Sequence, residues 1–223
     1  MTTQRTEHDS LGELQVPARA YYGVHTQRAR LNFPITGTPI SIYPDLIAAL
    51  ACVKQASAMA NRELGLLDKR RGDAIIRACE EIRAGSLHEE FVVDVIQGGA
   101  GTSTNMNANE VIANRALELL GHQHGEYAHL HPIDHVNMSQ STNDVYPTAI
   151  KVGLHFAIAR LIDAMEVLRV AFADKADEFA SVLKMGRTQM QDAVPMTLGQ
   201  EFSTFAVMLG EDQARLTEAQ ALI

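Results

Sequence analysis

The segment PTAIKVGLHFAIARLIDAMEVLRVAFADKADEFASVL, residues 147–183, carries the clearest structural signal in the chain. Its apolar residues recur at steps of three and four, and it holds one glycine and no proline after its first residue. This spacing predicts a single helix roughly 55 Å long at about 1.5 Å per residue. A compact domain of this chain length has a radius of gyration of only about 17 Å, so such a helix must project from it. Its apolar stripe needs partners, which predicts a helical bundle completed by other chains.

Shorter amphipathic segments precede the long one, and most are followed by glycine, the usual residue after a helix end. We predict helices at 44–61, 68–84, 87–97 and 107–120. Pro195 opens a last helix, which runs to Ile223 without a glycine or a basic last turn, so we expect this chain to be the N-terminal part of a longer protein. The region before Tyr43 is expected to be loop, with a short strand at 37–42.

These elements predict a mainly α protein with two domains. Residues 1–143 would form an N-terminal helical domain, and residues 144–223 would begin a central bundle of long helices that this chain holds only in part. A composition poor in aromatic residues, which make up 5% of the chain, and lacking tryptophan favours helix over a β-sandwich.

Charge and composition exclude several classes of partner. The chain has 19 Lys and Arg against 27 Asp and Glu, a net charge of −8, so it offers no basic surface for nucleic acid or anionic lipid. No segment approaches the ~18 apolar residues of a membrane span, and the start, Met1–Ser10, is polar. Two cysteines, Cys52 and Cys79, cannot form a disulfide framework for a chain of this size. We therefore expect a cytoplasmic protein.

Three polar segments each stand just before a predicted helix: GGAGTSTN at 98–105, SQSTND at 139–144 and GRTQMQD at 186–192. Unpaired backbone N–H groups and the positive end of the helix dipole gather at such places, which suits a carboxylate or phosphate. Helix capping explains any one of them. Three together predict a site rich in neutral donors for a small dianion.

Five histidines fall within fourteen residues, at positions 122, 124, 129, 131 and 135. Two His-x-His pairs could ligate a transition metal, but no cysteine or His-Glu-x-x-His pattern accompanies them. Gly125 and Pro132 place the group on a surface connection, so solvated histidines are the favoured interpretation, with a metal site or a secondary anion site as alternatives. We expect no metal ligands.

Taken together, the motifs resemble the conserved regions of the aspartase/fumarase superfamily along essentially the whole chain. The densest parts are residues 16–26, with VPARAYYGVHT, and 98–110, 131–147 and 185–201. GAGTS at 99–103, STN at 141–143 and GHQHGEY at 121–127 resemble aspartases more than fumarases. Gln189 stands where fumarases carry a histidine, and Ile133 replaces the usual asparagine of the 131–137 loop.

The resemblance implies reversible elimination of ammonia from L-aspartate to give fumarate through an enediolate, without an organic cofactor. Some aspartases are activated by divalent metal. Members are homotetramers whose long helices form a bundle. The resemblance places substrate on Thr102, Ser141, Thr142, Asn143, Thr188 and Gln189, the first three on the β-carboxylate and Thr188 on the α-carboxylate. It also implies a weaker secondary anion site at His131, Asp134, His135 and Asn137.

The family's base is a serine in a Gly-Ser-Ser-x-Met-Pro-x-Lys-x-Asn loop, and this sequence does not contain that pattern. We therefore expect no catalytic residue in this chain, and no activity from it alone. Two alternatives stay open: a fumarate hydratase acting on malate and fumarate, and a non-catalytic helical assembly fragment whose hydroxyl-rich segments only cap helices.

Overall fold

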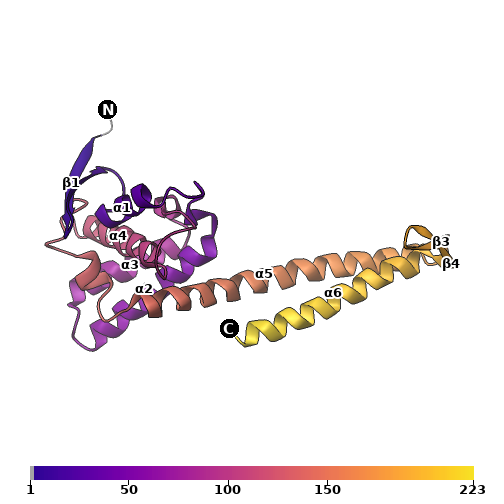
Figure 1. The fold of residues 1–223 in the computed structure, drawn as a ribbon. Helices are drawn as coiled ribbons and strands as arrows, with labels where there is room; N and C mark the ends of the chain where they lie inside the picture. The colour runs from indigo at the N-terminus through magenta and orange to yellow at the C-terminus, as the bar shows by residue number, and fades with distance from the viewer. Residues whose placement is uncertain (1–2) are drawn as a thin grey trace. The chain divides into compact units, whose positions relative to one another are not determined.

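The structure, a computed structural model, describes residues 3–223. It falls into two compact units, one ending at Gly153 and one spanning Leu154–Ile223 (Figure 1). Helix α5, Thr142–Glu178, begins in the first unit and continues into the second. The predicted mainly helical fold is confirmed. None of the helices among residues 3–223 is both long and apolar enough to cross a membrane.

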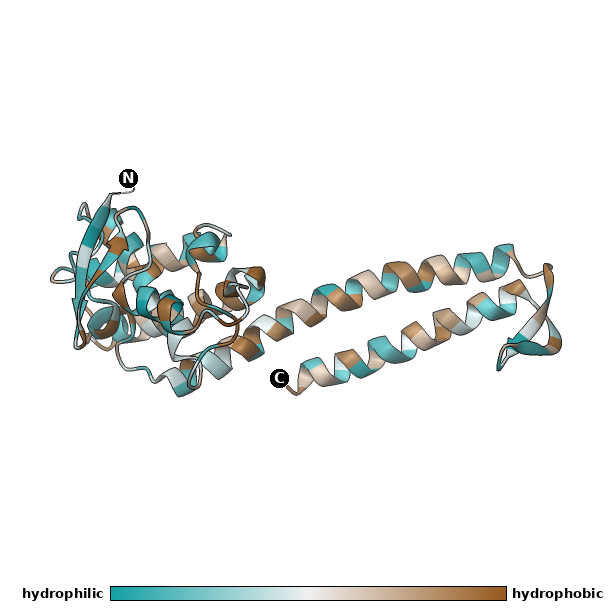
Figure 2. Cartoon of the chain, turned by 45° about the horizontal axis from the view of Figure 1, so that its top comes forward, coloured by the Kyte–Doolittle hydropathy of each residue, from teal (hydrophilic) through white to brown (hydrophobic). Residues whose placement is uncertain are grey.

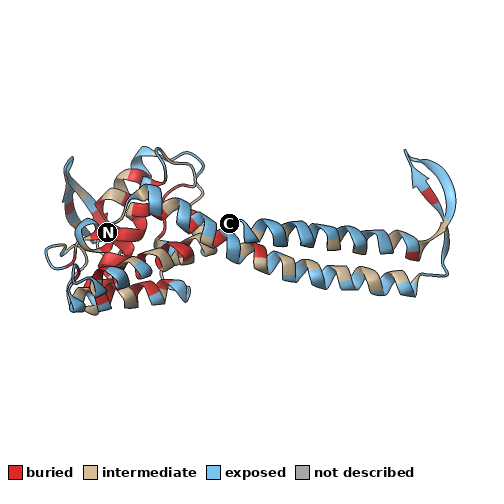
Figure 3. Cartoon of the chain, turned by 90° about the horizontal axis from the view of Figure 1, so that it is seen from below, coloured by how far each residue is buried: buried red, intermediate tan, exposed pale blue. Residues whose placement is uncertain are grey.

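The first unit is built around helix α4, which is buried along most of its length (Figure 3). Each fully buried large apolar side chain on it, such as Ile112 or Leu117, stabilises the unit by about 1.5–3 kcal/mol. The elements of this unit are the antiparallel hairpin β1 (Gln4–Asp9) and β2 (Gly12–Pro17), then α1 (Val24–Asn32), α2 (Pro44–Glu63), α3 (Lys69–Arg83) and α4 (Thr102–Leu119). The helices predicted at 44–61 and 68–84 are confirmed.

Two buried carboxylates cap the N-terminus of α1. Glu110, on α4, accepts hydrogen bonds from the backbone N–H groups of Gly23, His25 and Thr26 at 2.8, 2.8 and 3.1 Å. Glu7, on β1, accepts one from Val24 N at 2.8 Å. Negative charge at the positive end of a helix is favourable, so these bonds fasten α1 to the hairpin and to α4.

Substitution of Gly23 by alanine is predicted to destabilise the first unit. A Cβ there would lie 2.5 Å from Tyr127 Oη and 2.6 Å from Glu7 Oε2, and the backbone φ of −122° adds no strain of its own. Overpacking of this kind costs about 1–3 kcal/mol. The measurement is urea unfolding of Gly23→Ala beside Gly210→Ala, whose Cβ would meet only ordinary contact at 3.7 Å. Equal stability of the two variants would contradict the prediction.

Several predicted elements in the first unit are wrong. Residues 87–97 form only a three-residue 3₁₀ helix, His88–Glu90, because Leu87 before it takes a left-handed conformation with φ of 62°. Beyond it the carboxylate of Asp94 accepts four hydrogen bonds, from Thr36 N, Thr36 Oγ1, Gly37 N and Ile96 N, and so holds an open loop. The strand expected at 37–42 is a 3₁₀ turn, Ile40–Ile42, beside a single bridge between Pro39 and Asp94.

Other differences concern where elements begin. The region before Tyr43 holds the β1–β2 hairpin and α1 rather than loop alone. Helix α4 begins at Thr102 rather than at 107, and α5 begins at Thr142 with Pro147 inside it. The polar residues at these helix starts have weak helix propensity but are favoured as N-terminal caps, so apolar periodicity does not indicate that the helix extends over them.

The second unit is an antiparallel pair of helices joined by a hairpin. Strands β3 (Leu183–Thr188) and β4 (Gln191–Thr197) connect α5 to α6 (Leu198–Ala221). The long helix therefore ends before 183, and the last helix starts after Pro195, which lies in β4. Thr197 and Gln200 form a capping box that fixes the start of α6.

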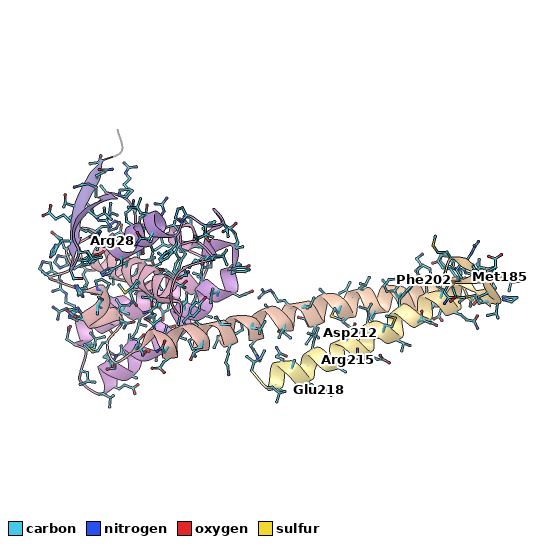
Figure 4. All side chains as sticks on the ribbon, viewed as in Figure 1. Arg28, Met185, Phe202, Asp212, Arg215 and Glu218 are labelled. Atoms are coloured by element: carbon cyan, nitrogen blue, oxygen red, sulfur yellow. The ribbon has the colours of Figure 1, made fainter. Side chains whose placement is uncertain are left out.

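Contacts within the second unit run along both helices. Gln213 and Gln220 donate to the carbonyls of Ile162 and His155 at 3.2 and 3.0 Å. Near the hairpin, Phe202, labelled in Figure 4, lies 5.8 Å from the Phe172 ring and 5.5 Å from that of Phe179, measured between centroids. Hydrophobic positions recur along both helices (Figure 2). Large apolar side chains among them are exposed: Leu154, Phe156, Leu161, Val167, Leu168 and Val170 on α5, and Phe205, Val207 and Met208 on α6.

Candidate functional site

The N-termini of α4 and α5 lie against each other in the first unit. Gly101 precedes α4 in a left-handed conformation with φ of 85°, and any Cβ there would overlap the ring of Tyr146 on α5. Asn105, in the first turns of α4, donates through Nδ2 to Thr142 Oγ1 at 3.1 Å. Two of the three polar segments found in the sequence are thereby brought together.

This junction presents hydroxyl and amide groups to solvent. Thr102, Ser141 and Asn143 are exposed, and Thr142 is half-buried. Ser141 Oγ accepts from Asn143 N at 3.2 Å, so the segment is ordered before any ligand is present. Pro147 has no N–H to bond the carbonyl of Asn143, which leaves that carbonyl without its usual helical donor. The positive ends of two helix dipoles and several neutral donors together suit a carboxylate.

A buried polar layer supports the junction from below. Lys54 on α2 is fully buried, and its Nζ donates to Asn137 Oδ1 at 2.8 Å and to Gln140 Oε1 at 3.0 Å. Asn105 and Asn109 on α4 donate to the same Asn137 oxygen at 3.1 and 3.2 Å. The loop that leads into Thr142 is therefore tied to α2 and α4 at once.

Burial lowers the pKa of the Lys54 ammonium to about 7, because the low-dielectric interior disfavours its charged form. Lys54 was not predicted from the sequence as part of the site. The signal was present, since Lys54 falls at four-residue steps between Leu50 and Ala58 on the buried stripe of α2.

The lowered pKa predicts how stability depends on pH. Between pH 7 and about 10.5 the unfolded chain binds a proton at Lys54 that the folded chain has released, so the free energy of unfolding should rise with pH there, by at most about 1.4 kcal/mol per unit. Urea unfolding at several pH values should show that Lys54→Met loses this part of the slope. Lys151→Met, which removes an exposed lysine of α5, should keep it. An unchanged slope in Lys54→Met would disprove the prediction.

A small pocket of about 220 Å³ opens beside the start of α4. It is lined in part by Thr102 and Ser103, with His25 and Arg28 of α1. The hydrogen bond that His25 Nδ1 donates to Glu110 Oε1 at 3.0 Å raises the pKa of His25, which places a readily protonated group in the same pocket as Thr102. Arg28, labelled in Figure 4, is bound to Asp9 at 2.6 and 2.8 Å. Because α1 was expected to be loop, neither residue was predicted at the site.

The residues expected at a secondary anion site divide into two places. His131, Asp134 and His135 line a pocket of about 570 Å³ that also includes Glu7. His131 Nδ1 accepts from the backbone N–H groups of Ile133 and Asp134, and His135 Nδ1 accepts from His131 N. Asn137 lies instead in the buried layer with Lys54.

Thr188 and Gln189 belong to the second unit, at the turn of its hairpin. Gln189 and Met190 both have positive φ, 49° and 62°, which is the type I′ turn that usually takes Asn-Gly. Met190 is 97% exposed. Backbone of this kind in residues other than glycine is costly and is often found at functional sites.

Comparisons with known proteins identify the family. Residues 12–223 match the family model described as Lyase. Aspartate ammonia-lyase from Pseudomonas fluorescens is 64% identical over 212 residues, which cover 95% of this chain and 44% of that enzyme. The solved structure of fumarate lyase:delta crystallin from Brucella melitensis in native form has a TM-score of 0.96 and 55% identity, covering 99% of this chain and 51% of that one.

A more distant structure, recombinant class II fumarase from Schistosoma mansoni, has a TM-score of 0.90 and 37% identity, covering 99% of this chain and 46% of that one. The chain thus spans a little under half the length of the curated relatives it matches. The aspartase/fumarase-like fold expected from the motifs is confirmed. This chain belongs to the Lyase family and is a homologue of the aspartate ammonia-lyases.

Proposed function

We propose that this chain carries the carboxylate-binding part of an aspartate ammonia-lyase, which eliminates ammonia from L-aspartate reversibly to give fumarate. The observation that carries the proposal is the junction of α4 and α5, where Thr102, Ser141, Thr142 and Asn143 surround two helix N-termini. Identity of 64% to an aspartate ammonia-lyase, against 37% to a fumarase, favours ammonia elimination over hydration.

The chemistry explains why such a junction is useful. Removal of the proton beside the β-carboxylate leaves an enediolate, in which that carboxylate carries additional negative charge. Catalysis requires donors that bind this intermediate more strongly than they bind the substrate. Fixed hydroxyl and backbone N–H groups meet that requirement. A cation would bind the carboxylate of the substrate as strongly as that of the intermediate, and so would give no such preference.

The remaining parts of the site are proposed on the family resemblance. Thr188 would bind the α-carboxylate and Gln189 would orient the substrate, since an amide cannot transfer a proton near neutral pH. The base would be the serine of the family's Gly-Ser-Ser loop, a pattern absent from these 223 residues. The pocket at His131, Asp134 and His135 would serve as a secondary anion site.

We also propose a cytoplasmic homotetramer, with residues 1–143 as the lyase domain and residues 144–223 as the start of the central bundle. The exposed apolar side chains of α5 and α6 support it, because two helices alone leave them in water. The free cysteines Cys52 and Cys79 suit a reducing compartment.

The direct test joins this chain to the remaining C-terminal part of the Pseudomonas fluorescens relative and follows fumarate by ultraviolet absorption. The chimera, checked as a tetramer by light scattering, should form fumarate from L-aspartate, whereas the 223 residues alone should not. Formation from malate but not from aspartate would establish the hydratase instead. A tetrameric chimera inactive on both substrates would leave only the assembly role.

Removal of one hydroxyl from the junction tests the site within that chimera. Ser141→Ala should lower kcat for aspartate about 10²–10³-fold, as expected for loss of one donor to a developing oxyanion. The matched control is Ser57→Ala, since Ser57 Oγ donates to the Val53 carbonyl of its own helix. A change in KM alone would show that Ser141 holds the substrate without stabilising the enediolate.

A further inference from the structure

Three metal-ligating side chains meet in the loop after α4, and the proposed elimination uses none of them. They are His122, Glu126 and His129, and their ligand atoms all lie within 4.8 Å of one another. His122 Nδ1 is 3.5 Å from Glu126 Oε2. The group is open to solvent, with the His122 side chain 25% and the Glu126 side chain 46% exposed.

The backbone that carries these side chains is fixed. Gly121, with φ of 84°, ends α4 in a Schellman motif, in which His122 N donates to the Leu117 carbonyl at 2.9 Å. His129 N donates to the Glu126 carbonyl at 3.0 Å, and Arg71 Nε donates to the His129 carbonyl at 2.6 Å. The three Cα atoms are therefore held in place, and only side-chain torsions remain free.

The side chains are also arranged before any ion is added. The rings of His122 and His129 are stacked, with centroids 3.9 Å apart and planes at 12°. Gln123 N donates to Glu126 Oε2 at 2.9 Å, which orients the carboxylate. Zinc takes imidazole nitrogen and carboxylate oxygen at about 2.0–2.2 Å, so two ligands of one ion lie at most about 4.4 Å apart. The present separations reach 4.8 Å, slightly more than this limit, so binding requires the side chains to turn toward a common ion.

The other histidines of this region are already engaged. His124 packs on the ring of Tyr21, with centroids 4.4 Å apart. His131 and His135 each use Nδ1 to accept a backbone N–H group. The His-x-His pairs visible in the sequence therefore do not supply the ligands, and the structure instead pairs His122 with His129, seven positions along the chain.

We propose that His122, Glu126 and His129 bind one divalent transition metal ion, with water in the remaining positions. Two imidazoles and one carboxylate suit zinc, cobalt or nickel rather than magnesium or calcium, which prefer oxygen ligands. This proposal replaces the expectation that the histidines hold no metal. It is independent of the lyase reaction, because the site lies beyond the C-terminal end of α4 whereas Thr102 begins that helix.

The test uses the 223-residue chain without a histidine tag. Zinc is titrated calorimetrically, and cobalt is followed by its visible absorption, which reports coordination number. One ion per chain should bind, and thermal unfolding should shift upward with added zinc. His122→Gln and His129→Gln should each weaken binding at least about ten-fold. His155→Gln, an exposed histidine of the second unit, should leave it unchanged.

Two results would overturn the proposal. One is an absence of zinc binding by the unaltered chain in excess zinc, with its fold verified by circular dichroism. The other is equal binding in His122→Gln, His129→Gln and the unaltered chain. If His135→Gln alone abolished binding, the ion would sit at the 131–135 turn and the assignment would again be wrong.

Discussion

Three donors from two helices converge on one oxygen, the Oδ1 of the half-buried Asn137. Lys54 reaches it from α2, and Asn105 and Asn109 reach it from α4. Leaving such groups unpaired in the interior costs about 1–3 kcal/mol each, more for a charge, so the loop before α5 has little freedom to move. The same Asn105 amide continues to Thr142 Oγ1. The position of the Thr142 hydroxyl thus depends on the polar layer beneath it.

This support explains how the proposed site, which is made of neutral groups, would bind a dianion. Hydroxyls and helix N-termini attract charge weakly in water, where reorganising solvent competes with them. Where buried hydrogen bonds hold the backbone that carries them, they need little reorganisation when charge develops, and this gives fixed dipoles their advantage in catalysis. Gly101 contributes by allowing Tyr146 to approach, which closes the distance between the two helices.

Amphipathic periodicity was sufficient to predict the helices at 44–61 and 68–84, because the buried residues of each helix lie along one face. The same periodicity gave wrong predictions at 87–97 and 183–197. In the first segment the Asp94 carboxylate holds a loop, and in the second a type I′ turn at Gln189 makes a hairpin. Motif resemblance predicts Thr102 and Ser141 as substrate-binding residues, which stays a prediction. Lys54 was not predicted, since a single lysine in a helix is ordinarily solvated.

The loop after α4, which carries the proposed metal site, is also bonded to the core of the first unit. Tyr127 lies between Glu126 and His129, and its Oη interacts with Asn114 at 3.1 Å and with Glu7 at 3.3 Å. Glu7 in turn caps α1, so the loop is part of what fastens the hairpin to the core. Helix α4 has 18 residues, about 27 Å at its usual rise, which separates this loop from the hydroxyls at Thr102. An ion bound there would therefore act on the stability of the first unit, and its effect should appear in unfolding rather than in the chemical step.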